Sequence, residues 1–316
     1  MATLVTGAYG FIGSWVVRQL VKEGEAVFAF DLNDDAHRLR LSMTDDEIAK
    51  VHFIKGDITE AAQVNAAIEK NQISSIIHLA ALQVPFCRAN PRGGARVNVE
   101  GTVNIFQSAL ETGIKRVTYA SSAGVYGPAN MYPPGPLAHN APLIPLTLYG
   151  VYKQADEALA KVYWQMDGVT SIGVRPYTVY GPGRDQGMTS TPTAAMFSAA
   201  KGEDYHISFG GIGQYQLGRD VAESIIKASR VKFEGAECFN LGGSVADMSE
   251  IVKHIKAVVP GVKISYEPKP LNLPQSLDGS QFEHVVGKMN WTPLEHGIRE
   301  TIEAFQSLLA SGRIKV

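Results

Sequence analysis

Near its start the chain reads Ala2-Thr3-Leu4-Val5-Thr6-Gly7-Ala8-Tyr9-Gly10-Phe11-Ile12-Gly13, an apolar run followed by a glycine-rich turn. The run Ala2 to Val5 is typical of a short buried strand, and Phe11 to Lys22 carries apolar residues at helical spacing. Backbone N–H groups at the start of that helix, with its dipole, can hold a pyrophosphate. Three such glycines could also serve only tight turns and close packing. Their position between a strand and a helix favours dinucleotide binding.

A carboxylate follows the second expected strand, about twenty residues after the glycine-rich turn. The strand Ala26 to Phe30 leads into Asp31, which can accept hydrogen bonds from the adenosine ribose and would repel a 2′-phosphate. The sequence therefore favours NAD over NADP. Arg38 and Arg40 could attract the 2′-phosphate of NADP, which leaves that cofactor open. Solvated charges on the surface are the simpler interpretation of these two arginines. After the third strand, Asp57-Ile58 could flank the adenine, and Asp57 could equally cap a helix.

Strands and helices go on alternating beyond this point. The expected elements are a strand at Val51 to Ile54, a helix at Glu60 to Lys70, a strand at Ile76 to Leu79, a helix at Asn98 to Thr112, a strand at Arg116 to Ala120, a helix at Tyr149 to Trp164 and a strand at Ser171 to Arg175. Such alternation predicts an α/β fold, with a parallel sheet wound by helices on both faces.

The content of proline and glycine rises at two places along the chain. Prolines crowd residues 127–147, which predicts a loop over the site. From Pro182 onward glycine and proline become frequent, so a smaller second domain is expected, and a strand at Ala236 to Leu241 would return the chain to the first. We therefore expect one domain over residues 1–180, rejoined by about 219–243, and a smaller one formed by 181–218 and 244–316.

Tyr149 and Lys153 stand four residues apart, on one face of the expected helix. Tyrosine is ordinarily a weak base at neutral pH, but a nearby ammonium and a positive nicotinamide would stabilise the phenolate. Tyr149 could then accept an alcohol proton, while Lys153 holds the nicotinamide ribose and Ser122 orients the reacting oxygen. Chance spacing explains such a pair in isolation. A dinucleotide turn upstream makes that explanation improbable.

Composition narrows the class of partner. The 316 residues are 45% hydrophobic and 19% charged, with a net charge of -2, which suits a globular protein and gives no footprint for nucleic acid or an anionic membrane. Only Cys87 and Cys238 are present, outside any metal-binding spacing, and the histidines show no ligand spacing, so no metal is expected. No charged leader precedes an apolar core, which predicts a cytoplasmic location.

The sequence resembles the extended short-chain dehydrogenase/reductase superfamily, also called the NAD-dependent epimerase/dehydratase family. The resemblance covers nearly the whole chain and rests on Thr6 to Gly13, His78-Leu79-Ala80-Ala81, Asn98-Val99-Glu100-Gly101-Thr102, Tyr119 to Ser122 with Val125-Tyr126-Gly127, Tyr149 to Lys153, Arg175-Pro176 with Val179 to Gly183, and Asn290 to Pro293 with Gly297 to Thr301.

This resemblance implies a Rossmann-type sheet with a smaller C-terminal α/β substrate-binding domain, and Ser122, Tyr149 and Lys153 as catalytic residues. Members are commonly dimers through two helices, here about residues 98–112 and 149–164. Asn98 would support the cofactor loop, or could merely cap its helix. The expected NAD-binding residues are Gly7, Tyr9, Gly10, Phe11, Ile12, Gly13, Asp31, Asp57, Ile58, Leu79, Ala80, Ala81, Asn98, Ser121, Tyr149, Lys153, Pro176 and Val179.

Departures from the family pattern narrow the reaction. Ala123 and Gly124 stand where dehydratases and decarboxylases of the family carry acids, so epimerisation, our leading expectation, or net dehydrogenation remains. The residues that hold a diphosphate in UDP-galactose 4-epimerase are missing from the matching stretches of this sequence. A substrate without a diphosphate would therefore also fit, such as a free sugar, a sugar acid or a hydroxy acid. Arg184, Arg219 or Arg88 could supply a charge. The expected substrate-binding residues are Gln83, Ser122, Tyr149, Thr178 and Arg184. An NAD-sensing protein without catalysis is the alternative from another class.

Overall fold

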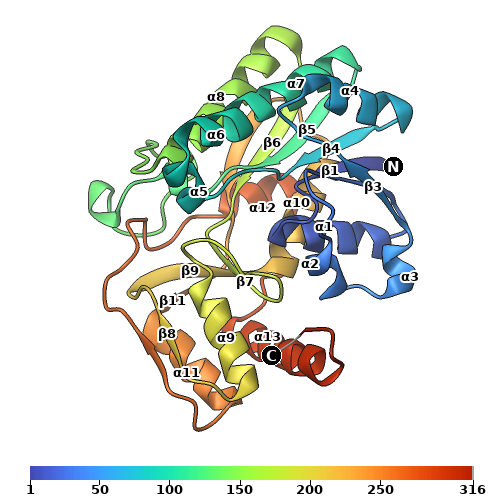
Figure 1. Ribbon diagram of the computed structural model, residues 1–316. Helices are drawn as coiled ribbons and strands as arrows, with labels where there is room; N and C mark the ends of the chain where they lie inside the picture. Colours follow the sequence, from blue (N-terminus) through green and yellow to red (C-terminus); the bar gives the residue numbers. More distant parts are fainter. Residues whose placement is uncertain (315–316) are drawn as a thin grey trace.

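The computed structural model describes residues 1–314 and places seven parallel strands in one central sheet (Figure 1). The strands are β1 (Ala2–Thr6), β2 (Ala26–Asp31), β3 (Val51–Lys55), β4 (Ser75–His78), β5 (Arg116–Ala120), β6 (Thr170–Arg175) and β10 (Ala236–Asn240). Their order is β10-β6-β5-β4-β1-β2-β3. The direction of winding reverses between β1 and β4, and in such sheets ligands bind at the carboxyl ends of the strands beside that reversal.

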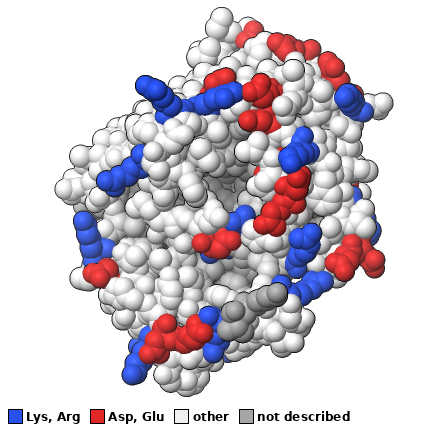
Figure 2. Space-filling model, viewed as in Figure 1, with Lys and Arg blue, Asp and Glu red and all other residues white. Residues whose placement is uncertain are grey.

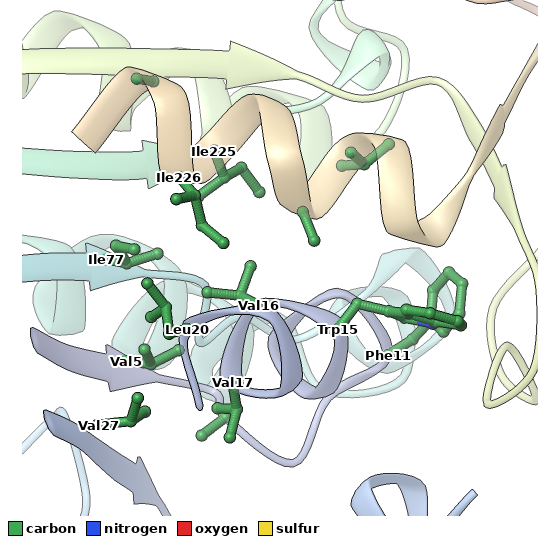
Figure 3. Close-up of a cluster of buried hydrophobic side chains, with 14 of the residues drawn as sticks. Val5, Phe11, Trp15, Val16, Val17, Leu20, Val27, Ile77, Ile225 and Ile226 are labelled. Carbon is green, nitrogen blue, oxygen red and sulfur yellow. The ribbon is translucent and has the colours of Figure 1, made fainter. Parts of the chain in front are cut away.

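Helices cover both faces of the sheet, which confirms the predicted fold class (Figure 1). One face carries α1 (Phe11–Lys22), α10 (Gly218–Arg230) and α12 (Ser280–Val286), and the other carries α4 (Ala61–Lys70), α7 (Gly101–Glu111) and α8 (Leu148–Asp167). Neighbouring residues of β1 serve opposite faces, because strand side chains alternate. Val5 joins the cluster with α1 and α10 (Figure 3), whereas Leu4 joins the other cluster. Burying each stabilises the fold by about 1.5–3 kcal/mol.

Two helical regions around the large sheet differ from the prediction. The structure adds α2 (His37–Arg40), α3 (Asp45–Ile48), α5 (Val84–Ala89) and α6 (Pro91–Ala95), none of which was predicted. The helix expected from Asn98 is preceded by α6, which Asn90 caps through a hydrogen bond from the Gly93 amide, 3.0 Å. A π-helical turn over Arg96–Glu100 then leads into α7. Asn98 therefore lies inside the helical stretch and does not cap it.

A smaller part of the molecule has its own sheets and core. Its three-stranded sheet has the order β11-β9-β7 and its two-stranded sheet pairs β12 with β8. The elements are β7 (Thr178–Tyr180), α9 (Thr191–Lys201), β8 (Tyr205–Ile207), β9 (Ile212–Leu217), β11 (Ser244–Asp247), α11 (Met248–Val258), β12 (Ile264–Tyr266) and α13 (Leu294–Ala310). Between β9 and β11 the chain returns to the large part of the molecule, where β10 joins the seven-stranded sheet and α10 packs on one face of it. The domain boundaries given above stay a prediction.

The proline-rich stretch after β5 forms a loop with 3-10 turns at Ala123–Val125 and Ala129–Met131. Within residues 1–314, no helix combines the length and the apolar character that crossing a membrane requires.

Candidate active site

Two connected clefts lie where the winding of the large sheet reverses. The inner cleft, of about 360 Å³, is lined by Ser122, Tyr149 and Lys153 among others. The outer cleft, of about 330 Å³, is lined by Asp31 and Asp57 among others. Both share the residues Gly7, Gly10, Phe11, Leu79, Ala81, Gln83 and Arg184. Figure 2 shows a hollow near the middle of this face of the molecule, bordered largely by uncharged residues.

The glycine-rich turn between β1 and α1 has no room for a side chain at Gly7 or Gly13. Gly7 has a φ of +65°, and a Cβ there would lie 2.6 Å from the backbone nitrogen of Ala80. A Cβ on Gly13 would lie 2.1 Å from the carbonyl oxygen of Gly7. Gly10 caps α1 without a side-chain acceptor, which leaves the first amides of the helix for another acceptor. The turn thus forms a bare backbone cradle suited to a pyrophosphate.

Asp31 lies in the outer cleft at the end of β2. Its Oδ2 accepts a hydrogen bond from the Tyr9 amide, 2.9 Å, which ties it to the glycine-rich turn. Arg38 also lines this cleft, but Asp185 accepts from its Nη2 at 2.7 Å and Tyr9 O accepts from its Nη1 at 2.9 Å. The Arg38 charge is therefore neutralised within the protein. This arrangement suits a ribose without a 2′-phosphate.

Asp57 holds a local turn and does not cap α4, whose first turn begins after Glu60. Its Oδ1 accepts hydrogen bonds from the amide and the hydroxyl of Thr59, each 2.8 Å, just before α4. Asp57 and Ile58 also line the outer cleft together with Tyr9 and Ala80. The turn is therefore structural and faces the expected adenine pocket.

Ser122, Tyr149 and Lys153 meet at the inner cleft. Ser122 follows β5 and its Oγ accepts a hydrogen bond from the Gly124 amide, 3.0 Å. A Cβ on Gly124 would lie 3.3 Å from Ser122 Oγ and 3.5 Å from the Tyr149 ring, so this glycine sits between the two side chains. Thr147 caps α8 by accepting from the Gly150 amide, 3.0 Å, which fixes the start of the helix that carries Tyr149 and Lys153.

Lys153 has a buried counter-charge that the sequence analysis missed. Its Nζ donates to Asp156 Oδ2 at 3.1 Å, and both side chains are almost fully buried. Burial acts to lower the pKa of Lys153, but Asp156 and Tyr149 outweigh it and raise that pKa. Burial raises the pKa of Asp156 to about 6. The i,i+3 spacing of a lysine and an aspartate was the available signal, yet most such pairs lie on exposed helix faces.

A second buried ion pair supports the strand ends beside Ser121. Arg175 Nη2 donates to Glu157 Oε2 at 2.6 Å, and Arg175 Nε donates to Glu157 Oε1 at 2.8 Å. Ser121 Oγ donates to the same carboxylate at 2.5 Å. Arg175 also donates to the hydroxyl of Tyr126, 2.6 Å. These contacts join β5, β6 and α8 directly behind the inner cleft.

Asn98 stands behind the clefts and lines neither. Its Oδ1 accepts from the Leu82 amide at 2.7 Å, and its Nδ2 donates to the Leu82 carbonyl at 2.9 Å. Asn98 thus holds the loop after β4 in place. The preceding residues of that loop, Leu79 to Ala81, line the clefts.

The remaining expected cofactor residues lie at the inner cleft. Ile12 and Gly13 contribute from the start of α1, Ser121 from the end of β5, and Pro176 and Val179 from the segment after β6. Every expected cofactor residue except Asn98 therefore lines one cleft or both.

Thr178 is not brought to either cleft, contrary to expectation. It is buried in β7, opposite Tyr215 of β9, and its neighbour Tyr177 lines the inner cleft instead. Successive residues of an extended segment point to opposite sides, so an error of one position reversed the assignment. Arg219 is also turned away, because Glu300 and Thr292 accept its hydrogen bonds.

The inner cleft also contains residues that the sequence analysis did not single out. They are Leu146, Thr147, Tyr177, Met188, Thr189, Leu271, Asn272 and Leu273. The segment at 271–273 is fixed from behind, because Tyr177 Oη donates to the Pro274 carbonyl at 2.6 Å. No motif marks this segment, and its place depends on the packing of the smaller part.

Comparisons with known proteins point to one family. A family model described as "NAD dependent epimerase/dehydratase family" matches residues 3–242. UDP-glucose 4-epimerase from Mycolicibacterium smegmatis is 30% identical over 320 residues, covering 97% of this chain and 99% of that protein.

Solved structures agree with this match. UDP-glucose 4-epimerase from Thermus thermophilus, in complex with NAD, superposes with a TM-score of 0.83 at 25% identity, covering 98% of this chain and all of that one. L-threonine dehydrogenase from Clostridium difficile has a TM-score of 0.86 at 24% identity, covering 96% of this chain and 97% of that one, which shows a shared fold.

Proposed function

This chain belongs to the NAD-dependent epimerase/dehydratase family, and on that basis we propose that it oxidises a secondary alcohol of a sugar-type substrate in the inner cleft. The observation that carries the proposal is the convergence of Ser122, Tyr149 and Lys153 in a cleft that continues into the glycine cradle. A reacting alcohol at this place would lie between a proton acceptor and the cofactor site.

The residues of the two clefts fit NAD. The cradle at Gly7 to Gly13 would hold the pyrophosphate, because the first amides of α1 have no side-chain acceptor at the cap. Asp31 would bind the adenosine ribose, and Asp57 with Ile58 would flank the adenine. Bound NAD supplies the acceptor for the hydride that leaves the alcohol carbon.

The protein's own residues would move and hold the proton. Tyr149 would accept the proton of the substrate hydroxyl, and the Lys153 ammonium would stabilise the resulting phenolate. Asp156 keeps Lys153 charged and fixes its position, since the two are paired at 3.1 Å in a buried setting. Ser122 would donate a hydrogen bond to the substrate oxygen as it becomes a carbonyl.

No carboxylate is found among the described residues that line the inner cleft. A second acid/base step at a neighbouring carbon, as dehydration needs, therefore has no candidate group. Return of the hydride to the other face of the same carbon, which is epimerisation, needs no such group and is the leading outcome. Net dehydrogenation is the second candidate. Arg219, a possible diphosphate ligand, points away from the cleft, so a substrate without a diphosphate stays a candidate for this reaction.

The test follows NADH absorbance and substrate interconversion with a panel of sugars, sugar acids and UDP-sugars. Tyr149→Phe is assayed beside the wild type and should lose activity by orders of magnitude while still binding NAD. Conversion without net NADH supports epimerisation, and accumulating NADH establishes dehydrogenation. A Tyr149→Phe protein as active as the wild type would refute the mechanism, and NAD binding without turnover of any compound would favour a sensor.

The proposal includes a homodimer formed through α7 and α8. On α8, Val151, Val162 and Met166 are 46%, 47% and 77% exposed. Their spacing places them on one side of the helix. Such exposed apolar side chains on one helix suit an interface between two copies. A cytoplasmic location also belongs to the proposal, in keeping with two free buried cysteines, Cys87 and Cys238.

A further inference from the structure

Arg184 is a cation in the inner cleft with no counter-charge of its own. Among the described residues that line this cleft, Lys153 and Arg184 are the two cations, and there is no aspartate or glutamate. Asp156 neutralises Lys153 from behind. Arg184 has only the Thr189 hydroxyl as a hydrogen-bond acceptor, at 3.0 Å, and its Nε is buried without a partner among residues 1–314. A half-buried guanidinium in this state favours an anionic ligand.

The nearest carboxylate in sequence does not fill this role. Asp185 receives two hydrogen bonds from Arg38 Nη2, at 2.7 and 3.0 Å, and a third from Arg38 Nε at 3.2 Å. Burial lowers the pKa of Arg184, and the nearby Tyr149 and Asp185 act in the opposite direction. Arg184 and Tyr149 both line the inner cleft, so the guanidinium shares this space with the expected proton acceptor.

A second polar side chain meets Arg184 across the cleft. Gln83 begins α5 without making a side-chain cap. A Cβ on Gly187 would lie 2.1 Å from Gln83 Oε1 and 3.3 Å from Arg184 Nη2, so both side chains reach the space beside this glycine. Gly187 has a φ of +95°, which also favours glycine there. The amide of Gln83 and the hydroxyl of Thr189 are free to complete the recognition of a planar anion.

Hydrogen bonds from two glutamines of β9 hold part of the wall of the inner cleft in place. Gln216 Oε1 accepts from the Tyr177 amide at 2.8 Å, and Gln214 Oε1 accepts from the Leu277 amide at 2.7 Å. Gln216 thus holds Tyr177, and Gln214 holds the segment that contributes Leu271 and Leu273 to the wall. The space of about 360 Å³ must receive the nicotinamide end of the cofactor as well as the substrate. It is near the lower end of the ~300–1,000 Å³ usual for ligand sites.

We infer that Arg184, with Gln83 and Thr189, forms a carboxylate-binding subsite, and that the substrate is a small hydroxy acid of the sugar-acid type rather than a nucleotide sugar. This inference rests on the proposed function. The guanidinium would grip the carboxylate through paired hydrogen bonds while the hydroxyl to be oxidised lies at Tyr149. The cofactor pyrophosphate is the other anion that Arg184 could bind. The first amides of α1 are available for the pyrophosphate, however, and Thr189, the partner of Arg184, lines the inner cleft and not the outer one.

The test compares Arg184→Met and Arg184→Lys with wild type and with Arg92→Met, a control at an arginine that lines neither cleft. Each protein is assayed with matched pairs, a hexuronate or aldonate against its neutral parent sugar, and with UDP-glucose. The Kd for NAD is measured separately by fluorescence titration. We expect wild type to prefer the acids, and Arg184→Met to lower kcat/KM for them about 10- to 100-fold with an unchanged Kd for NAD. Arg184→Lys should retain part of the activity.

Other outcomes overturn the inference in distinguishable ways. A weaker Kd for NAD in Arg184→Met, with acids and neutral sugars affected equally, would assign Arg184 to the cofactor. Wild-type turnover of UDP-glucose or neutral sugars in preference to acids would refute the subsite and leave the proposed function standing. If no compound is oxidised or epimerised, the proposed function fails. Calorimetric titration of the acids into the NADH complex then decides the subsite, which is refuted if wild type and Arg184→Met bind equally.

Discussion

The Lys153 ammonium depends on a carboxylate one helical turn away. Asp156 Oδ2 accepts its hydrogen bond, while Asp156 Oδ1 has no partner among the described residues. The carboxylate is therefore committed to Lys153, and Lys153 in turn faces Tyr149 and the inner cleft. Asp156 touches neither cleft, so it is a positioning residue that acts through Lys153.

Replacing Asp156 with Asn removes the counter-charge and keeps the shape. We expect a loss of about 3 kcal/mol in the free energy of unfolding, because a buried ammonium is left unpaired. The pKa of Lys153 should fall, since Asp156 is a main cause of its rise. The alkaline part of the kcat/KM profile against pH should then shift. An Asn variant with wild-type stability and an unchanged pH profile would contradict the assignment.

A buried histidine gives the protein a defined pH dependence. His78, at the end of β4, has Nδ1 2.7 Å from Thr6 Oγ1 and Nε2 3.1 Å from Thr102 Oγ1. Burial, with a smaller effect from Lys153, lowers its pKa to about 3. In the unfolded chain the pKa is about 6.5, so between pH 6.5 and 3 the unfolded state binds the additional proton. His78 therefore destabilises the folded state increasingly as the pH falls through this window.

The change that tests this is His78→Gln, measured by urea unfolding between pH 7.5 and 4.5. The variant should be less stable than the wild type at pH 7.5, because the buried hydrogen bonds are disturbed. The difference should shrink on acidification, by up to about 1.4 kcal/mol per pH unit below 6.5. Since other groups such as Asp156 titrate in both proteins, the difference isolates His78. A gap that is constant or widens in acid would show the prediction wrong.

At the scale of elements, the alternation of strands and helices was predictable because each element carries a buried apolar face. The helix Phe11–Lys22 and the strand Arg116–Ala120 were predicted to the residue. α6 was missed since Gly93 and Gly94 lower its helix propensity, and capping by Asn90 compensates. Thr178 was misassigned because one position of register decides the side of a strand.

Two parts of the site were predictable because local sequence fixes them, and Ser122, Pro176 and Val179 were predictable from family motifs. The glycine cradle and the pair Tyr149–Lys153 each lie within one turn or helix, so spacing alone brought them together. Tyr177 and Leu271 reach the same cleft from segments that are far apart in sequence. Their place depends on how β7 and β9 pair, which no local pattern states. Asp156 was missed because charge on a helix is normally solvated.

One ion pair joins several elements behind Ser121. Arg175 of β6 binds Glu157 of α8, and its Nη1 also donates to the carbonyl of His139 in the loop over the site, 2.5 Å. Glu157→Gln should lower the free energy of unfolding by about 3–5 kcal/mol, because the Arg175 charge stays buried without its partner. NAD binding should weaken too, since Ser121, which lines the inner cleft, is then held by a neutral amide oxygen in place of a carboxylate. Urea unfolding and fluorescence titration measure the two effects.

A double variant separates pairing from packing in this ion pair. The double variant Glu157→Met with Arg175→Met should lower the free energy of unfolding by less than the sum of the two single changes. In the double variant neither charge is left buried without its partner. Glu60→Gln is the matched control, because Glu60 and Arg96 form an exposed pair. This change should lower the free energy of unfolding by less than about 1 kcal/mol. Equal losses from Glu157→Gln and Glu60→Gln would contradict the prediction.

At the scale of the whole molecule, α8 has two sides with different tasks. Its inward side carries Lys153, Asp156 and Glu157, all buried. Its outward side carries Val151, Val162 and Met166, which are exposed in the single chain. In Figure 1 this helix runs along the outer edge of the molecule beside α7. A second copy of the chain packed there would cover the apolar side of α8. It would also restrict the motion of this helix, which positions Tyr149.

Val162→Glu tests whether that outward side is the dimer interface. A glutamate there would have to be buried without a partner, so we expect a change from dimer to monomer in light scattering at micromolar concentration. Val245→Glu is the matched control, because Val245 is similarly exposed on β11 of the smaller part. It should remain dimeric. If dimerisation also stiffens α8, the Val162→Glu monomer should keep its NAD affinity but lose part of kcat. A monomeric wild type, or a Val162→Glu protein that stays dimeric, would place any self-association on another surface.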